Sequence, residues 1–176
     1  MVLKLNNKYP FKVNQTGEVV NDSTVLIKLE ENALIFEYDI FQNNKVYSPF
    51  KKDNDPIYNG DVVEVFISFD NRNDDYLEYE LSPTGLKFLG HISNPTLESP
   101  ILTLIEPKFD SIVELTNYGY KASISVDLPP NFDINNVLLN CFNINTEEGT
   151  SQKLFAISPT MCGSFHKSKY FVKLEK

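Results

Sequence analysis

One stretch of the sequence decides the fold class: Val62-Val63-Glu64-Val65-Phe66-Ile67-Ser68-Phe69. Every second residue from Val63 onward is apolar, whereas the set that begins at Val62 also contains a glutamate and a serine. Alternate side chains of a β-strand point to opposite faces of its sheet. The period of two therefore predicts a strand whose first set lies in a core and whose second set faces solvent.

The apolar runs on either side of this stretch are of similar length, and several alternate in the same way. They predict nine further strands, at residues 24–29, 33–41, 76–82, 86–92, 101–105, 112–115, 118–126, 137–144 and 153–158. Turn-forming residues separate the runs, for example Asn59-Gly60 and Pro83-Thr84-Gly85. Residues 132–139 hold at most one helical turn, and no repeat or linker is visible. About ten short strands at this spacing indicate one all-β domain over residues 1–176, an antiparallel β-sandwich of the jelly-roll or immunoglobulin-like kind.

The composition agrees with an all-β domain and argues against one class of partner. The chain has 176 residues, 41% of them hydrophobic, but it has only three alanines and many β-branched and aromatic residues. Its net charge of −8 at pH 7 and its single arginine, Arg72, argue against a nucleic-acid partner, because binding phosphates requires clustered Lys and Arg. Two buried free thiols are the preferred interpretation of Cys141 and Cys162, with a disulfide between them as the alternative.

No segment of the sequence predicts export or insertion into a membrane. Residues 1–11 lack the apolar core of a signal peptide, and no run approaches the roughly 18 apolar residues of a membrane-spanning helix. We therefore expect a cytoplasmic protein without a membrane partner, or an extracellular one if the chain is a module of a longer secreted protein. The sequence makes no prediction about the oligomeric state.

Several motifs follow one another along the chain in an informative order. They are Leu34-Ile35-Phe36-Glu37-Tyr38-Asp39, then Asp55-Pro56-Ile57-Tyr58-Asn59-Gly60-Asp61-Val62-Val63-Glu64-Val65-Phe66, then Tyr76-Leu77-Glu78-Tyr79-Glu80-Leu81-Ser82-Pro83-Thr84-Gly85, then Ser158-Pro159-Thr160, and Phe165-His166 before a last apolar run at residues 170–174. In this order they resemble the pattern of family 9 carbohydrate-binding modules and of the wider group of DOMON-like sandwiches. The resemblance covers roughly residues 25–174. It implies a β-sandwich that binds a glycan or the end of a sugar chain, without catalysis.

The resemblance also implies where a sugar would bind. The family's aromatic platform lies six residues before the glutamate of its Asp-x-Val-Glu motif, and Tyr58 has that position relative to Glu64. A flat ring fits the apolar face of a sugar, and a carboxylate accepts hydrogen bonds from its hydroxyls. Modules of this family enclose the sugar between two tryptophans, but this chain has none. Phe165 and Phe171 are the candidates for a second platform, and both could instead belong to the core.

The strand after Glu64 carries acids where sugar-binding members of the family carry cationic or amide side chains. Alternation places Tyr76, Glu78 and Glu80 on one face of that strand. Next to Glu64 they would form a strongly acidic patch, which favours a cation, an amino sugar or a basic partner. A solvated outer face is the alternative for the three glutamates, just as Tyr58 could simply cover the edge of the sandwich.

Further polar residues are candidates for contacts with the ligand: Asn140, Asn143 and His166. Each has a structural alternative, as a polar group at the end of a strand or as a hydrogen-bonded histidine. Asp39, Asp61 and the acidic turn that begins at Asp70 could hold a structural Ca²⁺, because calcium prefers clustered carboxylate and amide oxygens. Acidic turns without a metal are commoner, so the sequence permits calcium but does not require it.

Three other functions agree with parts of the sequence. Two of the glutamates could form the acid pair of a glycoside hydrolase, but neighbours on an open sheet face lack the desolvation that separates two pKa values. A haem-binding electron-transfer module would need His and Met ligands, and Met161 and His166 lie only five residues apart. The main alternative to sugar binding is a protein-interaction module on the same sandwich, motivated by the missing tryptophans and the added carboxylates.

Overall fold

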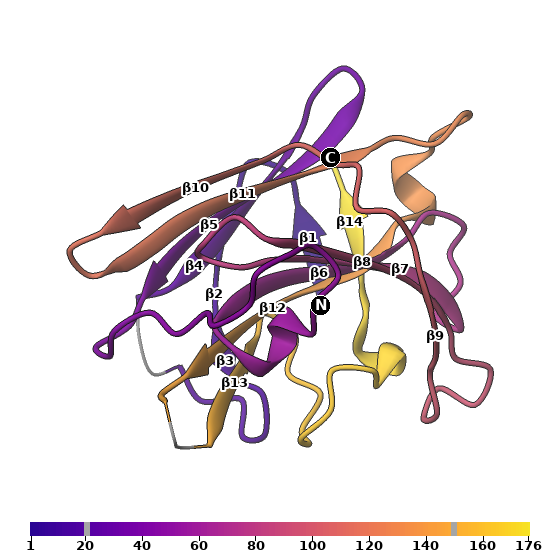
Figure 1. Ribbon diagram of the computed structural model, residues 1–176. Helices are drawn as coiled ribbons and strands as arrows, with labels where there is room; N and C mark the ends of the chain where they lie inside the picture. The colour runs from indigo at the N-terminus through magenta and orange to yellow at the C-terminus, as the bar shows by residue number, and fades with distance from the viewer. Residues whose placement is uncertain (20–21, 149–150) are drawn as a thin grey trace.

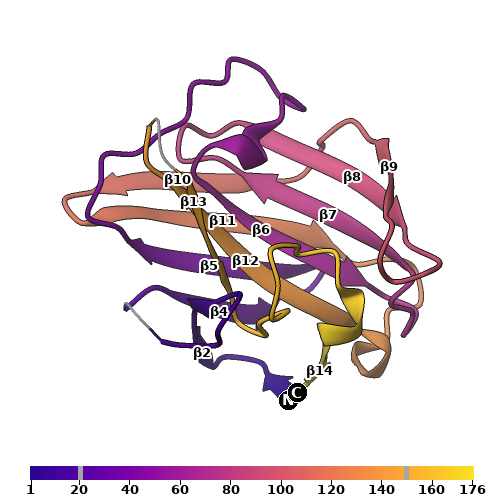
Figure 2. The same cartoon turned by 90° about the horizontal axis from the view of Figure 1, so that it is seen from below.

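The structure is a computed structural model that describes residues 1–19, 22–148 and 151–176. Within these ranges the chain forms fourteen strands and three short 3₁₀ turns, and the strands make two sheets that pack face to face (Figures 1 and 2). This is the predicted all-β sandwich. No helical segment in the described ranges is long and apolar enough to cross a membrane.

The larger sheet contains nine of the described strands. They are β1 (Val2–Lys4), β3 (Lys12–Val13), β6 (Val62–Ser68), β7 (Asp75–Leu81), β8 (Lys87–Ser93), β9 (Ile101–Leu104), β12 (Leu138–Thr146), β13 (Gln152–Ala156) and β14 (Val172–Glu175). The main path runs β1-β14-β12-β6-β7-β8-β9, and β13 pairs with both β12 and β3. Only the pair of β1 and β14 is parallel among these described pairs. The central strands β6, β7 and β8 therefore form a continuous antiparallel surface.

The smaller sheet contains the other five described strands. They are β2 (Lys8–Pro10), β4 (Thr24–Leu29), β5 (Ala33–Phe41), β10 (Ser111–Thr116) and β11 (Gly119–Asp127), in the order β10-β11-β5-β4-β2. Burial alternates strictly along β5, where every second residue from Leu34 to Ile40 is buried. These residues pack against Val63 and Val65 of the larger sheet in one apolar core. The period of two thus places one face of each sheet between the layers, as the sequence predicts.

The outer face of the larger sheet is covered as well, which corrects the prediction that half of β6 faces solvent. All seven residues of β6 are buried. The 3₁₀ turn η1 (Ile57–Asn59) and the segment that leads to η3 (Ser168–Tyr170) supply apolar side chains to a second cluster on this face. In that cluster Phe165 stacks on Phe142 at 4.1 Å, and Phe171 meets Phe66 edge-on at 6.4 Å. The covering segments have no strand period, so the alternation in β6 gives no sign of them.

The remaining differences from the predicted strands are small. All ten predicted strands are present, with ends that differ by at most two residues. The sequence gives no strand prediction for β1, β2 and β3, because two or three residues are too few to show a period; β14 is the final strand that the family resemblance implies. Residues 132–139 contain one 3₁₀ turn, η2 (Ile134–Asn136). Cys141 is buried and Cys162 half-buried, and both are free thiols, as preferred.

Candidate functional site

A pocket of about 320 Å³ opens on the outer face of the larger sheet. Strands β6, β7 and β8 form its floor, and its walls come from η1, the start of β9, the start of β13 and residues 163–166. The size falls at the lower end of the range for small-molecule sites. Its position on the sheet is fixed by the same covering segments that bury the outer face of β6.

Three glutamates lie together at the floor of this pocket. Glu64 on β6 stands directly opposite Glu80 on β7, and Glu78 is two residues along β7 on the same face. Glu64 is 1% exposed, Glu78 6% and Glu80 0%. Glu64 and Glu78 line the pocket, whereas Glu80 is enclosed beside them. The predicted acidic patch is therefore present, but it is buried rather than solvated.

None of the three carboxyl groups accepts a hydrogen bond from an amide, a hydroxyl or a cationic side chain of the residues that the structure describes. Both oxygens of Glu80 are fully enclosed without such a partner. None of the five ion pairs between described residues includes any of these glutamates. Like charges placed directly opposite each other on neighbouring strands destabilise a sheet. The arrangement therefore costs stability whenever two of these carboxyl groups are ionised together.

Burial raises the pKa of all three carboxyl groups above the ordinary glutamate value. The pKa of Glu78 rises to about 7. The charge of Glu78 raises the pKa of Glu64 further, and the charges of Glu64 and Glu78 together act on Glu80 in the same direction. At neutral pH the cluster therefore holds protons that a solvated glutamate has lost.

Tyr58 stands at the mouth of the same pocket. Its side chain is 38% exposed, and its ring meets Phe88 edge-on at 5.7 Å. Burial, followed by the charges of Glu80 and Glu78, raises the pKa of the Tyr58 hydroxyl. One pocket is thus lined by three residues that were predicted from separate motifs: Tyr58, Glu64 and Glu78.

His166 forms part of the pocket wall and is held from three sides. Its Nδ1 lies 2.9 Å from the hydroxyl of Tyr76, and its ring stacks on Phe66 at 5.1 Å. Its backbone carbonyl accepts a hydrogen bond from the Asn94 amide at 2.8 Å. Burial lowers the pKa of His166 to about 4, so the ring is neutral at pH 7. Tyr76 itself is buried beneath His166 and is not part of the pocket lining.

Asn140 and Asn143 lie outside the pocket. The Asn140 side chain donates to the carbonyl of Ser158 at 2.7 Å and accepts from its amide at 3.2 Å, which fastens the end of β13 to β12. Asn143 is on the inner side of β12, where it donates to the Tyr120 hydroxyl at 3.3 Å. Both amides are therefore satisfied by the protein, as in the structural alternative.

The three aspartates considered for calcium do not come together. Asp61 is buried and accepts hydrogen bonds from the amides of Thr146 at 2.6 Å and Tyr47 at 2.8 Å, which ties a loop to the sheet. Asp39 accepts from the Tyr118 hydroxyl at 3.0 Å. Within the described residues, no three His, Cys, Asp or Glu side chains are arranged to hold a metal ion.

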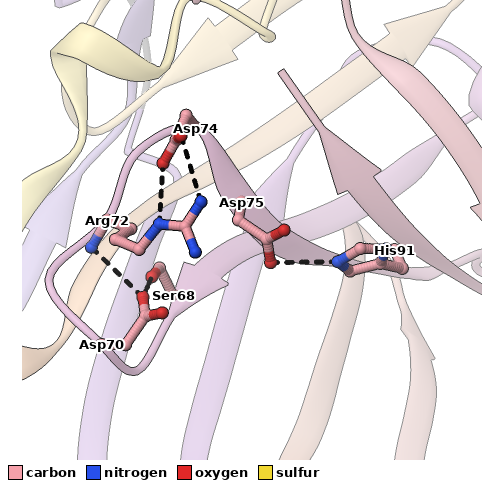
Figure 3. A network of polar contacts seen from close by, with 6 residues as sticks. All are labelled: Ser68, Asp70, Arg72, Asp74, Asp75 and His91. Carbon is pink, nitrogen blue, oxygen red and sulfur yellow. Dashed lines mark hydrogen bonds and ion pairs between the residues drawn. The ribbon is translucent and has the colours of Figure 1, made fainter. Parts of the chain in front are cut away.

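The acidic turn between β6 and β7 satisfies its own carboxylates (Figure 3). Asp70 accepts a hydrogen bond from the Ser68 hydroxyl at 2.7 Å, and Arg72 binds both oxygens of Asp74 at 3.0 and 3.1 Å. Asp75 lies 3.0 Å from Nε2 of His91. The turn is held by protein donors, so nothing about it requires an ion.

Several pocket residues carry no signal in the sequence. Phe88 and Leu102 line the pocket from β8 and β9. Gly90, opposite Glu78, allows this closure, because a side chain at position 90 would collide with Leu102. Phe165 was considered as a second platform, and it does line the pocket, whereas Phe171 belongs to the apolar cluster beneath it.

Comparisons with known proteins agree with the architecture. No family model matches the sequence, and a search of curated proteins finds no matching relative. A candidate carbohydrate-binding protein from Bacteroides uniformis superposes with a TM-score of 0.73 at 13% identity, over 94% of this chain and 85% of that one. A family 9 carbohydrate-binding module from Caldicellulosiruptor kristjanssonii, solved in complex with cellotriose, superposes with a TM-score of 0.67 at 12% identity, over 99% of this chain and 93% of that one.

The chain has the fold of a family 9 carbohydrate-binding module. The likeness extends over nearly the whole of each compared chain, so the sandwich is shared as a unit. Identities of 12% and 13% establish the fold alone. What this family 9 fold binds here has to be argued from the pocket.

Proposed function

We propose that the chain is a non-catalytic carbohydrate-binding module that holds a glycan, or the end of one, in the pocket on the outer face of the larger sheet. The observation that carries the proposal is the meeting of Tyr58 with Glu64 and Glu78 in that pocket. The half-exposed ring offers a flat surface for the C–H face of a sugar, and the acids beside it offer oxygens to the hydroxyls.

The acid cluster favours binding over hydrolysis. A glycoside hydrolase needs one carboxyl group that stays protonated and a second that stays ionised. Here burial shifts the pKa of Glu64, Glu78 and Glu80 in the same direction, upward. None of the three carboxyl groups is solvated, and burial is the largest influence on the pKa of each. The pocket therefore lacks the division of roles on which hydrolysis depends.

The proposal is tested by calorimetric titration with a panel of oligosaccharides, including cellotriose, on the intact chain and two variants. We expect Tyr58→Ala to weaken binding about tenfold, because the loss of a stacked ring costs about 1 kcal/mol. Glu64→Gln should weaken binding of neutral sugars by no more than about threefold, because the amide oxygen that remains still accepts a sugar hydroxyl. Tyr118→Ala, on the smaller sheet, is the matched control and should leave affinity unchanged. Thermal melts confirm that each variant remains folded.

The second candidate function, a protein-interaction module, is favoured by apolar side chains on the two edge strands. Ile101 and Leu104 on β9 are 63% and 54% exposed, and Ile112 on β10 is 72% exposed. An exposed edge strand can pair with an added chain. A panel in which no oligosaccharide binds at millimolar concentration would reject sugar binding and leave this alternative.

A further inference from the structure

The pocket contains two carboxyl groups, and its described lining has no cationic side chain. Its lining contains no lysine or arginine, and the one histidine, His166, is neutral and already paired through Nδ1 with Tyr76. The amide nitrogen of Gln152 is also occupied, because it donates to the Tyr58 carbonyl at 2.7 Å and to the Thr146 hydroxyl at 3.1 Å. Glu64 and Glu78 therefore face a described lining that offers them no positive charge.

Glu64 and Glu78 point to a ligand that brings its own donors. Both side chains are more than nine-tenths buried and both line the pocket, and neither accepts a hydrogen bond from an amide, a hydroxyl or a cationic side chain of the described residues. The Glu78 carboxyl group lies beside that of Glu80, with which it shares a proton. Buried charges in proteins are paired or neutralised. An ammonium group carries a positive charge, three donors and no acceptor, so it supplies what the cluster lacks. A bare metal ion fits less well, because no three such side chains in the described part of the chain are arranged to hold one.

The aromatic surfaces fit the same group on a sugar ring. Tyr58 and Phe88 border the acids, and a ring face attracts a cation as well as the C–H face of a sugar. The pocket of about 320 Å³ is broad enough for a sugar ring, which a thin lysine side chain would not fill.

We propose that the pocket recognises an amino sugar, with the protonated amine of the sugar bound by Glu64 and Glu78 and with the enclosed Glu80 beside them adding to the negative potential. This inference rests on the proposed carbohydrate-binding function and names its substrate class. The ammonium lies at the floor between the carboxyl groups, and the sugar ring lies against Tyr58 at the mouth. Ligand binding then favours the ionised form of these carboxyl groups, whose protons pass to the solvent as the ammonium takes their place.

The test compares three trisaccharides that share one β-1,4-linked glucose skeleton and differ at carbon 2. Cellotriose has a hydroxyl there, the glucosamine trimer an ammonium, and the N-acetylglucosamine trimer an acetamide. We expect the glucosamine trimer to bind at least about tenfold more tightly than the two neutral sugars, and to lose this advantage as salt is added. Calorimetric titration of the intact chain at pH 7 gives the three affinities.

Matched variants show whether the acids cause the preference. Glu64→Gln and Glu78→Gln should each reduce affinity for the glucosamine trimer by about tenfold or more, because each keeps the shape and removes a charge. Both should leave cellotriose within about threefold. Glu30→Gln removes the same charge from an exposed position on the smaller sheet and should change neither affinity. Thermal melts establish that the variants fold.

The outcomes separate the two proposals. If the three sugars bind equally, or if the glutamine variants leave their ratio unchanged, the amino-sugar inference is wrong and the sugar-binding function stands. If none of the three binds, both fail. Trilysine serves as the fourth ligand: binding of trilysine in place of the glucosamine trimer would assign the acids to a basic peptide and overturn the sugar.

Discussion

The outer faces of the two sheets carry the same kind of side chain in opposite surroundings. On the smaller sheet, Glu37 of β5 forms an ion pair with Lys28 of β4 at 2.6 Å, and both side chains are more than a third exposed. Asp39 stands opposite Lys121 of β11. These acids have cationic neighbours and water. On the larger sheet, the equivalent outward-facing acids of β6 and β7 have neither.

The difference shows what covering a sheet face does to its chemistry. A charged residue on an open face is solvated and its interactions are weak. When chain segments cover the face, the same residue loses water, its pKa shifts, and its interactions with a ligand become stronger. The site of this protein therefore depends on the segments that cross the larger sheet as much as on the strands.

The largest expected effect concerns the pH dependence of stability. The folded-state pKa of Glu78 is about 7, compared with 4.5 for a solvated glutamate. Between these values the folded chain holds a proton that the unfolded chain has released, so Glu78 stabilises the fold fully below about pH 4.5 and this contribution is lost as the pH rises through about 7. A shift of this size corresponds to about 3 kcal/mol. Chemical denaturation at pH 5 and pH 8 should show Glu78→Gln losing less stability over this interval than the unaltered chain.

The other titratable groups around the cluster do not produce the same slope. Burial raises the pKa of Tyr58, Tyr38 and Tyr76 and of the Cys141 thiol, and lowers that of His166 to about 4. In the folded chain these groups keep one protonation state between pH 5 and pH 8. His166 adds a slope of the opposite sign, because its pKa of about 4 in the folded chain lies below the 6.5 of a solvated histidine and the unfolded chain therefore binds the additional proton at pH 5. Glu64→Gln and Glu80→Gln should reduce the slope in the same direction. An unchanged slope in all three variants would mean that the cluster is not protonated in the folded state.

The second prediction concerns the enclosed member of the cluster. Glu80 accepts no hydrogen bond from an amide, a hydroxyl or a cationic side chain of the described residues, so Glu80→Met removes only its contact with the Glu78 carboxyl group. The variant replaces a desolvated acid by an apolar side chain of similar shape. We expect the free energy of unfolding at pH 8 to rise by about 1–2 kcal/mol, while affinity for the ligand falls. Urea denaturation measures the first effect and calorimetry the second. A variant that is less stable than the unaltered chain would assign Glu80 a structural role.

The sequence predicts the sheets well because their signal is local. Strands β4 and β5 have the predicted ends, and the shared face of Glu78 and Glu80 follows from alternation along β7. Tyr58 lies in the same pocket as Glu64, at the spacing that the family pattern implies. Each of these features depends on residues close together in the chain.

The environment of the site could not be predicted, because it depends on contacts between distant segments. Phe165 and His166 lie over the strands of the pocket floor, in a segment whose sequence shows no strand periodicity. They help to bury Glu64, which is about a hundred residues earlier in the chain. Alternation along β12 places the side chains of Asn140 and Asn143 on opposite faces of the strand. It does not say which of the two faces lies between the sheets. The burial of the glutamates is the property on which the proposed ligand depends, and it is this property that the sequence does not reveal.

The smallest expected effect lies on the open face and tests the contrast directly. Glu37→Gln removes the ion pair with Lys28, but water replaces the lost contact on both sides. We therefore expect the free energy of unfolding to change by less than about 1 kcal/mol, with no change in its slope between pH 5 and pH 8. The same denaturation experiments measure both quantities beside Glu78→Gln. Glu37→Gln could instead change the free energy of unfolding and its pH slope as much as Glu78→Gln does. Burial would then not explain the difference between the acids of the two sheets, and the buried acids would not indicate a ligand.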